Sequence, residues 1–180
     1  GDLDLHFEFG FDDYGNQTSF TNGNSKTRTS FYDAKGRLIR EYSPQGDANS
    51  GVMNGKYMVK EYIYDGIGRL TTKREGTSTA ATSDTTLSSV RSVTYKYEPY
   101  EGKLVEESYS DGRKIVRTYR SDQTQLADRI DLYNASGALV YYRIFSYDPT
   151  TWRQASVTTP EGVISYNYDS YGQLTRIRTS

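Results

Sequence analysis

The sequence has little of what most catalytic and metal centres are made from. It contains no cysteine and one histidine, His6. Without cysteine there are no disulfides, no thiol catalysis and no cysteine-bound metal, and one histidine excludes multi-histidine metal sites. His6 lies in the first expected strand, where a structural role is the better interpretation. We therefore expect no catalytic residue, no metal site and no cofactor.

Long hydrophobic runs and an excess of one charge are also missing. No apolar stretch approaches the roughly 20 residues that a membrane helix needs. Lys and Arg total 22 against 23 Asp and Glu, so the net charge attracts neither nucleic acid nor an anionic membrane. We expect no nucleic-acid partner and no membrane insertion of this segment.

Helical periodicity is the third absence. Apolar residues do not recur at the three-and-four spacing of an amphipathic helix, whereas alternation of apolar and polar residues is common. Only 34% of the residues are hydrophobic, and 18 residues are tyrosine. Tyrosine favours strands and tolerates a surface that is apolar along the ring and wet at the hydroxyl. The composition therefore predicts an all-β protein with negligible helix.

A short corner motif recurs along the chain, and its clearest form is the segment from Phe31 to Leu38. Asp33 at the first position of a type I turn can accept hydrogen bonds from the backbone ahead of it. Gly36, three residues later, can adopt the left-handed conformation that reverses the chain. The segment therefore predicts a hairpin whose first strand ends at Tyr32 and whose second strand begins at Arg37.

Copies of this corner appear at related intervals. The aromatic residue just before the turn acid, or before Asn134, stands at positions 11, 32, 64, 97, 133, 147 and 168, and Tyr119 divides the longest interval. In the copy at Asp148-Pro149 the expected glycine is replaced by Trp152. Such self-similarity is typical of repeat architectures, whose single units are too small to bury a face alone.

These intervals predict an antiparallel meander of repeated β-hairpins in a twisted or curled sheet of about fourteen short strands. We expect a single array over residues 1–180, interrupted by loops at 43–55 and 76–89. The second loop is rich in Thr, Ser and Ala, a composition typical of mobile segments.

The copies resemble the YD repeats of the RHS family, which read Tyr-Asp, two variable residues, then Gly-Arg-Leu. Residues 32–38 and 64–70 match in full, and the resemblance covers nearly the whole chain. It implies a secreted or cell-surface protein whose repeats form a ribbon of hairpins, which in larger members encloses a toxin or takes part in cell contact. A self-cleaving segment of larger members contains Asp-Pro and Gly-Leu, but Asp148-Pro149 matches only its first half, so that activity is not expected here.

Three sharper interpretations of the corners compete with turn formation. The corner acids could be paired carboxylates of a glycosidase, but each occupies the same position in its own repeat, which the turn explains. The acidic segment 12–16 resembles a calcium loop in composition without the spaced ligands and closing Glu. Gly66 and Gly68 match part of a dinucleotide signature that lacks its third glycine and its helix. We prefer the turn in each case.

Pairs of aromatic residues two positions apart point to one face of a strand. Aligned hairpins would join them into aromatic ladders that pack the sheet, each cross-strand pair contributing roughly 0.2–1 kcal/mol. The alternative is that exposed members stack on a ligand. The candidate ligand-stacking residues are Tyr62, Tyr64, Tyr95, Tyr97, Tyr166 and Tyr168.

Together these features predict a non-enzymatic structural or interaction module of an RHS-like protein, located outside the cell or in the cell envelope. The expected partners are other parts of the same long repeat protein, another protein or a glycan, with self-association through sheet edges as a further route. A carbohydrate-binding module that uses exposed tyrosines is the alternative function, and a glycosidase is a distant third.

Overall fold

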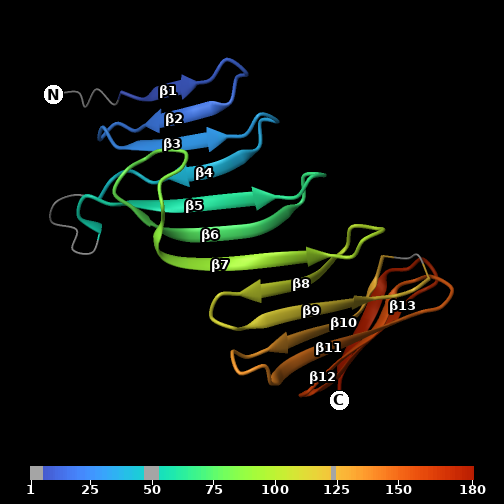
Figure 1. The fold of residues 1–180 in the computed structure, drawn as a ribbon. Coiled ribbons are helices and arrows are strands. Elements are labelled where there is room, and N and C mark those ends of the chain that lie inside the picture. Colours follow the sequence, from blue (N-terminus) through green and yellow to red (C-terminus); the bar gives the residue numbers. More distant parts are fainter. Residues whose placement is uncertain (1–5, 47–52, 123–124) are drawn as a thin grey trace. The chain divides into compact units, whose positions relative to one another are not determined.

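A computed structural model describes residues 6–46, 53–122 and 125–180. These residues form fourteen β-strands and no α-helix, which confirms the all-β prediction. Within this part of the chain no helix is long and apolar enough to cross a membrane. Strand order in the sheet follows the sequence, and the paired strands are antiparallel, as a meander of hairpins requires (Figure 1).

The chain divides into two compact units, residues 1–93 and residues 94–180. Strands of the first unit are β1 (Glu8–Phe11), β2 (Gln17–Thr21), β3 (Thr27–Tyr32), β4 (Leu38–Tyr42), β5 (Tyr57–Tyr64) and β6 (Leu70–Ser78). Strand β7 (Ser88–Tyr97) crosses the boundary. Strands of the second unit are β8 (Leu104–Tyr109), β9 (Lys114–Tyr119), β10 (Ala127–Tyr133), β11 (Leu139–Tyr147), β12 (Gln154–Thr159), β13 (Gly162–Tyr168) and β14 (Leu174–Thr179).

Five corners, at Asp12, Asp33, Asp65, Asn134 and Asp169, are closed by the hydrogen bonds that the motif predicts. In the β3–β4 corner the amide of Gly36 donates to the carbonyl of Asp33 at 2.9 Å, and the amide of Asp33 donates to the carbonyl of Arg37 at 2.9 Å. Gly36 has a φ of 74°, in the left-handed region that glycine adopts without a steric penalty. The turn assignment made from the sequence is therefore confirmed.

Strand pairing beside the corners contains a feature that the sequence pattern did not indicate. In β5–β6, Ile63 faces Thr72 but the next residue, Tyr64, faces Leu70, so Thr71 is an extra residue in the outgoing strand. The same shift occurs in the pairs β1–β2, β3–β4, β10–β11, β11–β12 and β13–β14. These β-bulges add twist beside each corner.

The corner at Asn134 lies on the edge of the second unit opposite the other tyrosine corners. It joins β10 to β11, whereas the corners after Tyr119, Tyr147 and Tyr168 follow odd-numbered strands and lie together (Figure 1). On the edge that the corners after odd-numbered strands share, the corner that precedes the one after Tyr147 is therefore the corner after Tyr119, not the one after Tyr133. Spacing alone placed the Asn134 corner in the same series, although it closes a hairpin from the other side.

One predicted loop is shorter than expected, and the other lies partly outside the described residues. Strand β6 continues to Ser78 and β7 begins at Ser88, so the loop between them is 79–87 rather than 76–89. It is held against β4, since the carbonyl of Thr82 accepts a hydrogen bond from the Tyr42 hydroxyl at 2.6 Å. Of the predicted loop 43–55, residues 47–52 lie outside the described part.

Buried apolar residues are few, as the composition predicts. Among the described residues Tyr42 and Val59 in the first unit and Val157 in the second are the buried hydrophobic side chains. Tyr42 lies between the rings of Phe31 and Tyr57, with centroids 5.9 and 5.8 Å away. Most strand residues are half-buried instead, so neighbouring strands must be held together by more than a central core.

Candidate functional site

A tyrosine hydroxyl connects successive hairpins at five corners. The hydroxyl of Tyr64 donates to the carbonyl of Leu38 at 2.8 Å, reaching from the end of β5 to the first residue of β4. The other four bonds have the same form, each to the first residue of the preceding strand: Tyr32 to Gln17, Tyr119 to Leu104, Tyr147 to Ala127 and Tyr168 to Gln154. We call this recurring bond the tyrosine link.

A cation lies over several of the linking rings. The guanidinium of Arg37 is 4.6 Å from the ring centroid of Tyr64, and Gly68 of the next corner lies close to the same guanidinium. Lys103 lies over Tyr119 at 5.3 Å, and Arg153 over Tyr168 at 5.8 Å. In each of these three cases the cation directly precedes the residue whose carbonyl accepts the tyrosine link.

The corner carboxylates are engaged within their own turns. One oxygen of Asp33 accepts from the backbone amides of Lys35 and Arg37 at 2.9 and 3.0 Å, and the other accepts from Nε of Arg37 at 2.7 Å. The Arg37 side chain, followed by the backbone amides, lowers the pKa of Asp33, and Arg69 does the same to the pKa of Asp65. A general acid for glycoside cleavage needs the opposite, a carboxyl group whose pKa is raised.

All six candidate ligand-stacking tyrosines are half-buried. Tyr64 and Tyr168 use their hydroxyls in tyrosine links, and burial raises the pKa of Tyr62. Four ring pairs among the described residues join other aromatic residues: Phe7 and Phe9 with Phe20, and Phe31 and Tyr57 with Tyr42. A stacking role for the six tyrosines stays a prediction.

Four corners present a large apolar side chain at the tip of the turn. The exposed fractions are 90% for Tyr14, 80% for Ile67, 95% for Tyr100 and 87% for Tyr171. The acid at the first turn position and the glycine at the last fix the backbone, so the tip side chain projects away from the strands. These tips are the most accessible large apolar groups of the described chain, and none of them was among the residues selected from the sequence.

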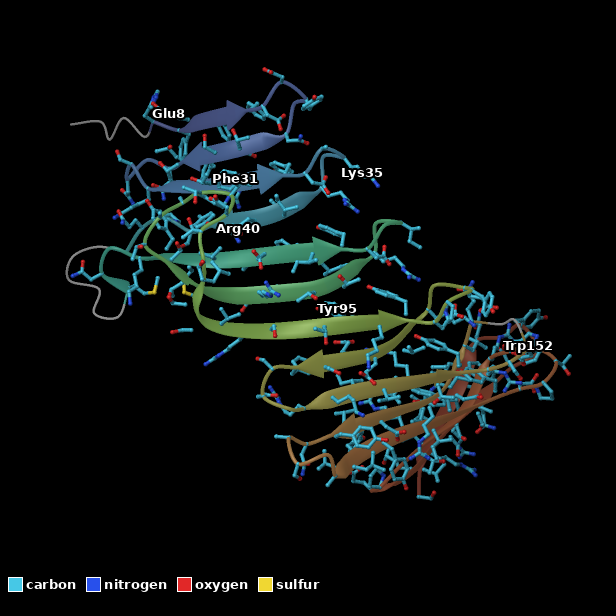
Figure 2. All side chains as sticks on the ribbon, viewed as in Figure 1. Glu8, Phe31, Lys35, Arg40, Tyr95 and Trp152 are labelled. Atoms are coloured by element: carbon cyan, nitrogen blue, oxygen red, sulfur yellow. The ribbon has the colours of Figure 1, made fainter. Side chains whose placement is uncertain are left out.

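A second polar centre surrounds Arg40 on β4, beneath the loop 79–87 (Figure 2). Nη1 of Arg40 donates to the carbonyls of Thr82 and Thr85 at 3.2 and 2.9 Å, and Nη2 is paired with Glu61. Arg74 contacts the other oxygen of Glu61 at 3.0 Å. Together with residues of the loop these groups line a recess of about 310 Å³.

The Arg40 centre fastens the loop rather than offering a free charge. Arg40 is 7% exposed, and its donors are taken up by loop carbonyls and by a carboxylate. Across the described residues, no group of three or more His, Asp or Glu side chains could hold a metal ion. The arrangement therefore suits a structural role, in which Arg40 holds the loop 79–87 against β4.

Two signals in the sequence could have pointed to these features. All of the turn acids except Asp12 are preceded by tyrosine, although any aromatic ring could pack in the same half-buried position. This preference indicates a role for the tyrosine hydroxyl. The tips Tyr14 and Tyr171 stand directly before the glycine, where a turn normally carries a small polar residue. No local signal marks the Arg40 centre, because its partners lie more than 20 residues away.

No known sequence family and no curated protein matches the chain. Among solved structures, it is similar to a chain in the crystal structure of TcdB2-TccC3-Cdc42, with a TM-score of 0.37 and 14% identity over 96% of this chain and 11% of that one. A chain in the structure of the Tc holotoxin pore of Photorhabdus luminescens has a TM-score of 0.37 and 15% identity, over 96% of this chain and 11% of that one. A porin-like protein from Bacteroides uniformis has a TM-score of 0.38 and 19% identity, over 69% of this chain and 49% of that one. The chain thus spans about a tenth of the toxin chains and about half of the porin-like protein, and these similarities add no argument to the β-rich repeat architecture described above.

Proposed function

We propose that the chain is a structural and contact module of an RHS-like repeat protein that is secreted or displayed at the cell surface. The tyrosine link supports this most strongly. It recurs between successive hairpins, and at four of the five links the tyrosine is followed by a turn acid, so that the two residues are those that name the YD repeat. The recurring chemistry of the motif thus serves to join repeats, which is what a scaffold requires.

Excision of one whole repeat tests the scaffold role. Removing residues 148–168 joins Tyr147 to Asp169, which leaves a tyrosine followed by a turn acid and the link from Tyr147 to Ala127 intact. We expect this shortened chain to fold with a cooperative melt and a β-type circular dichroism spectrum.

A smaller deletion is the control for this experiment. Removal of 148–158 deletes one strand of the pair and reverses the direction of every strand after it, so it should unfold the second unit. Equal damage from both deletions would refute a repeat scaffold.

The contact role falls to the tips of the corners. Tyr14, Tyr100 and Tyr171 expose nearly their whole rings on turns whose backbones are fixed. Exposed aromatic faces on rigid turns suit contact with another protein or with a sugar ring at little cost in conformational entropy. The same observation favours carbohydrate binding as the second candidate function, now through the tips rather than through the six half-buried tyrosines.

A glycan array probed with the intact chain separates the two roles. Selective binding that is lost when Tyr14, Tyr100 and Tyr171 are all replaced by alanine would establish the carbohydrate module. The matched control is Tyr62→Ala, which removes a tyrosine from a strand. If no glycan binds, the scaffold with protein contacts stands as the function. Glycan hydrolysis that disappears in Asp65→Asn would instead support the glycosidase.

A further inference from the structure

The β11–β12 corner is one residue longer than the β3–β4 corner. Its closing hydrogen bond runs from the amide of Asp148 to the carbonyl of Arg153, five residues on, at 2.8 Å. In the β3–β4 corner the amide of Asp33 donates to the carbonyl of Arg37, only four residues on, at 2.9 Å. Trp152 takes the place of the turn glycine, with a φ of 57° in the left-handed region (Figure 2). The arginine after the turn therefore leaves the backbone one position later.

In the shorter corner this arginine fills the space between two hairpins. Nε of Arg37 donates to one carboxylate oxygen of Asp33 at 2.7 Å, and the guanidinium lies 4.6 Å from the ring centroid of Tyr64. Nη1 of Arg37 is buried in this position. The chain's own guanidinium thus lies between a turn carboxylate and the tyrosine of the next hairpin.

The longer corner leaves its carboxylate without a guanidinium. One oxygen of Asp148 accepts from the amides of Thr150 and Thr151 at 3.0 and 2.7 Å, whereas no side chain among the described residues donates to the other oxygen. The guanidinium of Arg153 lies over the ring of Tyr168 at 5.8 Å, and Nη2 lies against Gly172 of the next corner. The site that Arg37 fills in the shorter corner is therefore not filled in the same way here.

A recess of about 330 Å³ lies between these two corners, which is within the range of small-ligand sites. Its lining includes Asp148, Thr151, Arg153, Tyr166, Tyr168 and Asp169. Two carboxylates against one guanidinium give this lining a net negative charge. The hydrogen bond from the amide of Thr151 lowers the pKa of Asp148, so that carboxylate is charged at neutral pH. A planar cation that donates to a carboxylate and lies on a tyrosine ring suits such a recess.

We propose that this recess binds the guanidinium of an arginine side chain from a partner protein. The guanidinium donates to the available oxygen of Asp148 and lies against the tyrosine rings of the recess, in the manner of Arg37 with Asp33 and Tyr64. The inference rests on the proposed function only for the source of the arginine, because none of the exposed tip residues lines the recess.

Titration of the full chain with N-acetyl-L-argininamide, followed by NMR of labelled tyrosine rings, tests the binding. We expect saturable shifts of the Tyr166 and Tyr168 signals. The citrulline analogue lacks the charge and the lysine analogue lacks the planar fork, so each should bind about tenfold more weakly. Absence of shifts with the arginine probe, or equal binding of either analogue, would overturn the proposal. Shifts produced by methyl α-D-glucoside in place of the arginine probe would overturn it in favour of a sugar site.

Replacement of the turn acid tests the role of its charge. Asp148→Asn should weaken binding of the arginine probe about tenfold. The turn should persist, because Oδ1 of Asn134 accepts the equivalent backbone hydrogen bonds in its own corner. Asp65→Asn is the matched control and should bind like the parent, since the carboxylate of Asp65 is already engaged by Arg69. Equal losses in the two variants would contradict a site at Asp148.

Shortening the corner should close the recess without removing any residue that lines it. Deletion of Pro149 together with Trp152→Gly leaves Tyr-Asp-Thr-Thr-Gly-Arg, the arrangement of residues 32–37. Arg153 should then pair with Asp148, so we expect binding of the arginine probe to be lost while the melting temperature does not fall. Trp152→Gly alone keeps the longer corner and should still bind. Unchanged binding by the shortened and folded chain would refute the proposed site.

Discussion

The two units are built from the same hairpins, but they stabilise them differently. In the first unit, the inserted loop 79–87 covers part of β4, and Tyr42 and Val59 are almost fully buried. No such loop covers the described strands of the second unit, whose one buried hydrophobic residue is Val157, at 7% exposure. The four ring pairs named above, which lie among the described residues, belong to the first unit. In the second, cations lie over Tyr109, Tyr119, Tyr133, Tyr141, Tyr142, Tyr147 and Tyr168.

This difference shows what a corner can and cannot supply. In the second unit, tyrosine links join strands that bury little apolar surface. The most fully buried residues, Tyr42 and Val59, belong to the unit in which a loop adds a second layer over the sheet. A two-sided sheet with half-buried residues excludes little water by itself. Four substitutions test these contributions to stability separately. They affect, in order, the loop that covers β4, the conformation of a turn, a tyrosine link and the charge of a turn acid.

Removal of the Arg40 side chain should have the largest effect. Arg40→Met leaves Glu61 partly buried and frees the carbonyls of Thr82 and Thr85, at a cost of about 2–4 kcal/mol. Hydrogen exchange in loop 79–87 should rise sharply, while the second unit stays protected. Arg74→Met is the control, since Arg74 contacts the same Glu61 from a more exposed position. Unchanged exchange in the loop would mean that Arg40 does not fasten it.

Gly68→Val should destabilise the β5–β6 corner by about 2 kcal/mol. Gly68 has a φ of 96°, and a β-branched residue resists positive φ. An added Cβ would also lie 3.4 Å from Nη1 of Arg37. Gly66→Val, in the same turn but with open space around it and no positive φ, is the matched control. Thermal melts should separate the two variants, and coincident melts would refute the turn assignment.

Tyr64→Phe deletes one tyrosine link and should cost about 1 kcal/mol, the usual worth of a single hydrogen bond. Tyr62→Phe removes a hydroxyl from the same strand without deleting a link and should cost less. Tyr168→Phe makes the same change in the uncovered unit, so its effect compared with Tyr64→Phe sharpens the contrast between the units. Urea unfolding measures all three. A loss in Tyr62→Phe as large as in Tyr64→Phe would argue against the link.

The smallest effect concerns pH. The folded-state pKa of Asp65 is lowered below 3.8, chiefly by the hydrogen bond from Arg69, so the unfolded chain binds its proton first. The stability that Asp65 contributes is therefore full at neutral pH and lost as the pH falls below about 4. Melting temperatures should decline more steeply in acid for the parent than for Asp65→Asn. Asn134 shows that the amide fits, since its Oδ1 accepts from the amides of Ser136 and Ala138 at 3.1 and 3.0 Å. Parallel acid profiles would contradict this.

Much of the candidate site was visible in the sequence, and the features that were missed have identifiable causes. The turn acids and glycines were found because their roles depend on backbone angles within four residues. The tips Tyr14 and Tyr171 were overlooked although their place directly before the turn glycine marks them as exposed, because the aromatic pairs of the strands were considered instead. The Asn134 corner was grouped with the wrong edge because spacing records where a turn falls but not on which side of the sheet it lies.

The amino-acid sequence by itself determined the strands, the turns and their repetition, because alternation and turn chemistry act over a few residues. Tertiary structure alone decided which hydroxyl reaches which carbonyl and where a core forms. The Tyr64 hydroxyl donates to the carbonyl of Leu38, and Arg40 donates to the carbonyl of Thr82. The number of residues between these partners does not predict that they are in contact. Such contacts form only once neighbouring strands are in register, since a shift of one residue would turn each side chain to the other face.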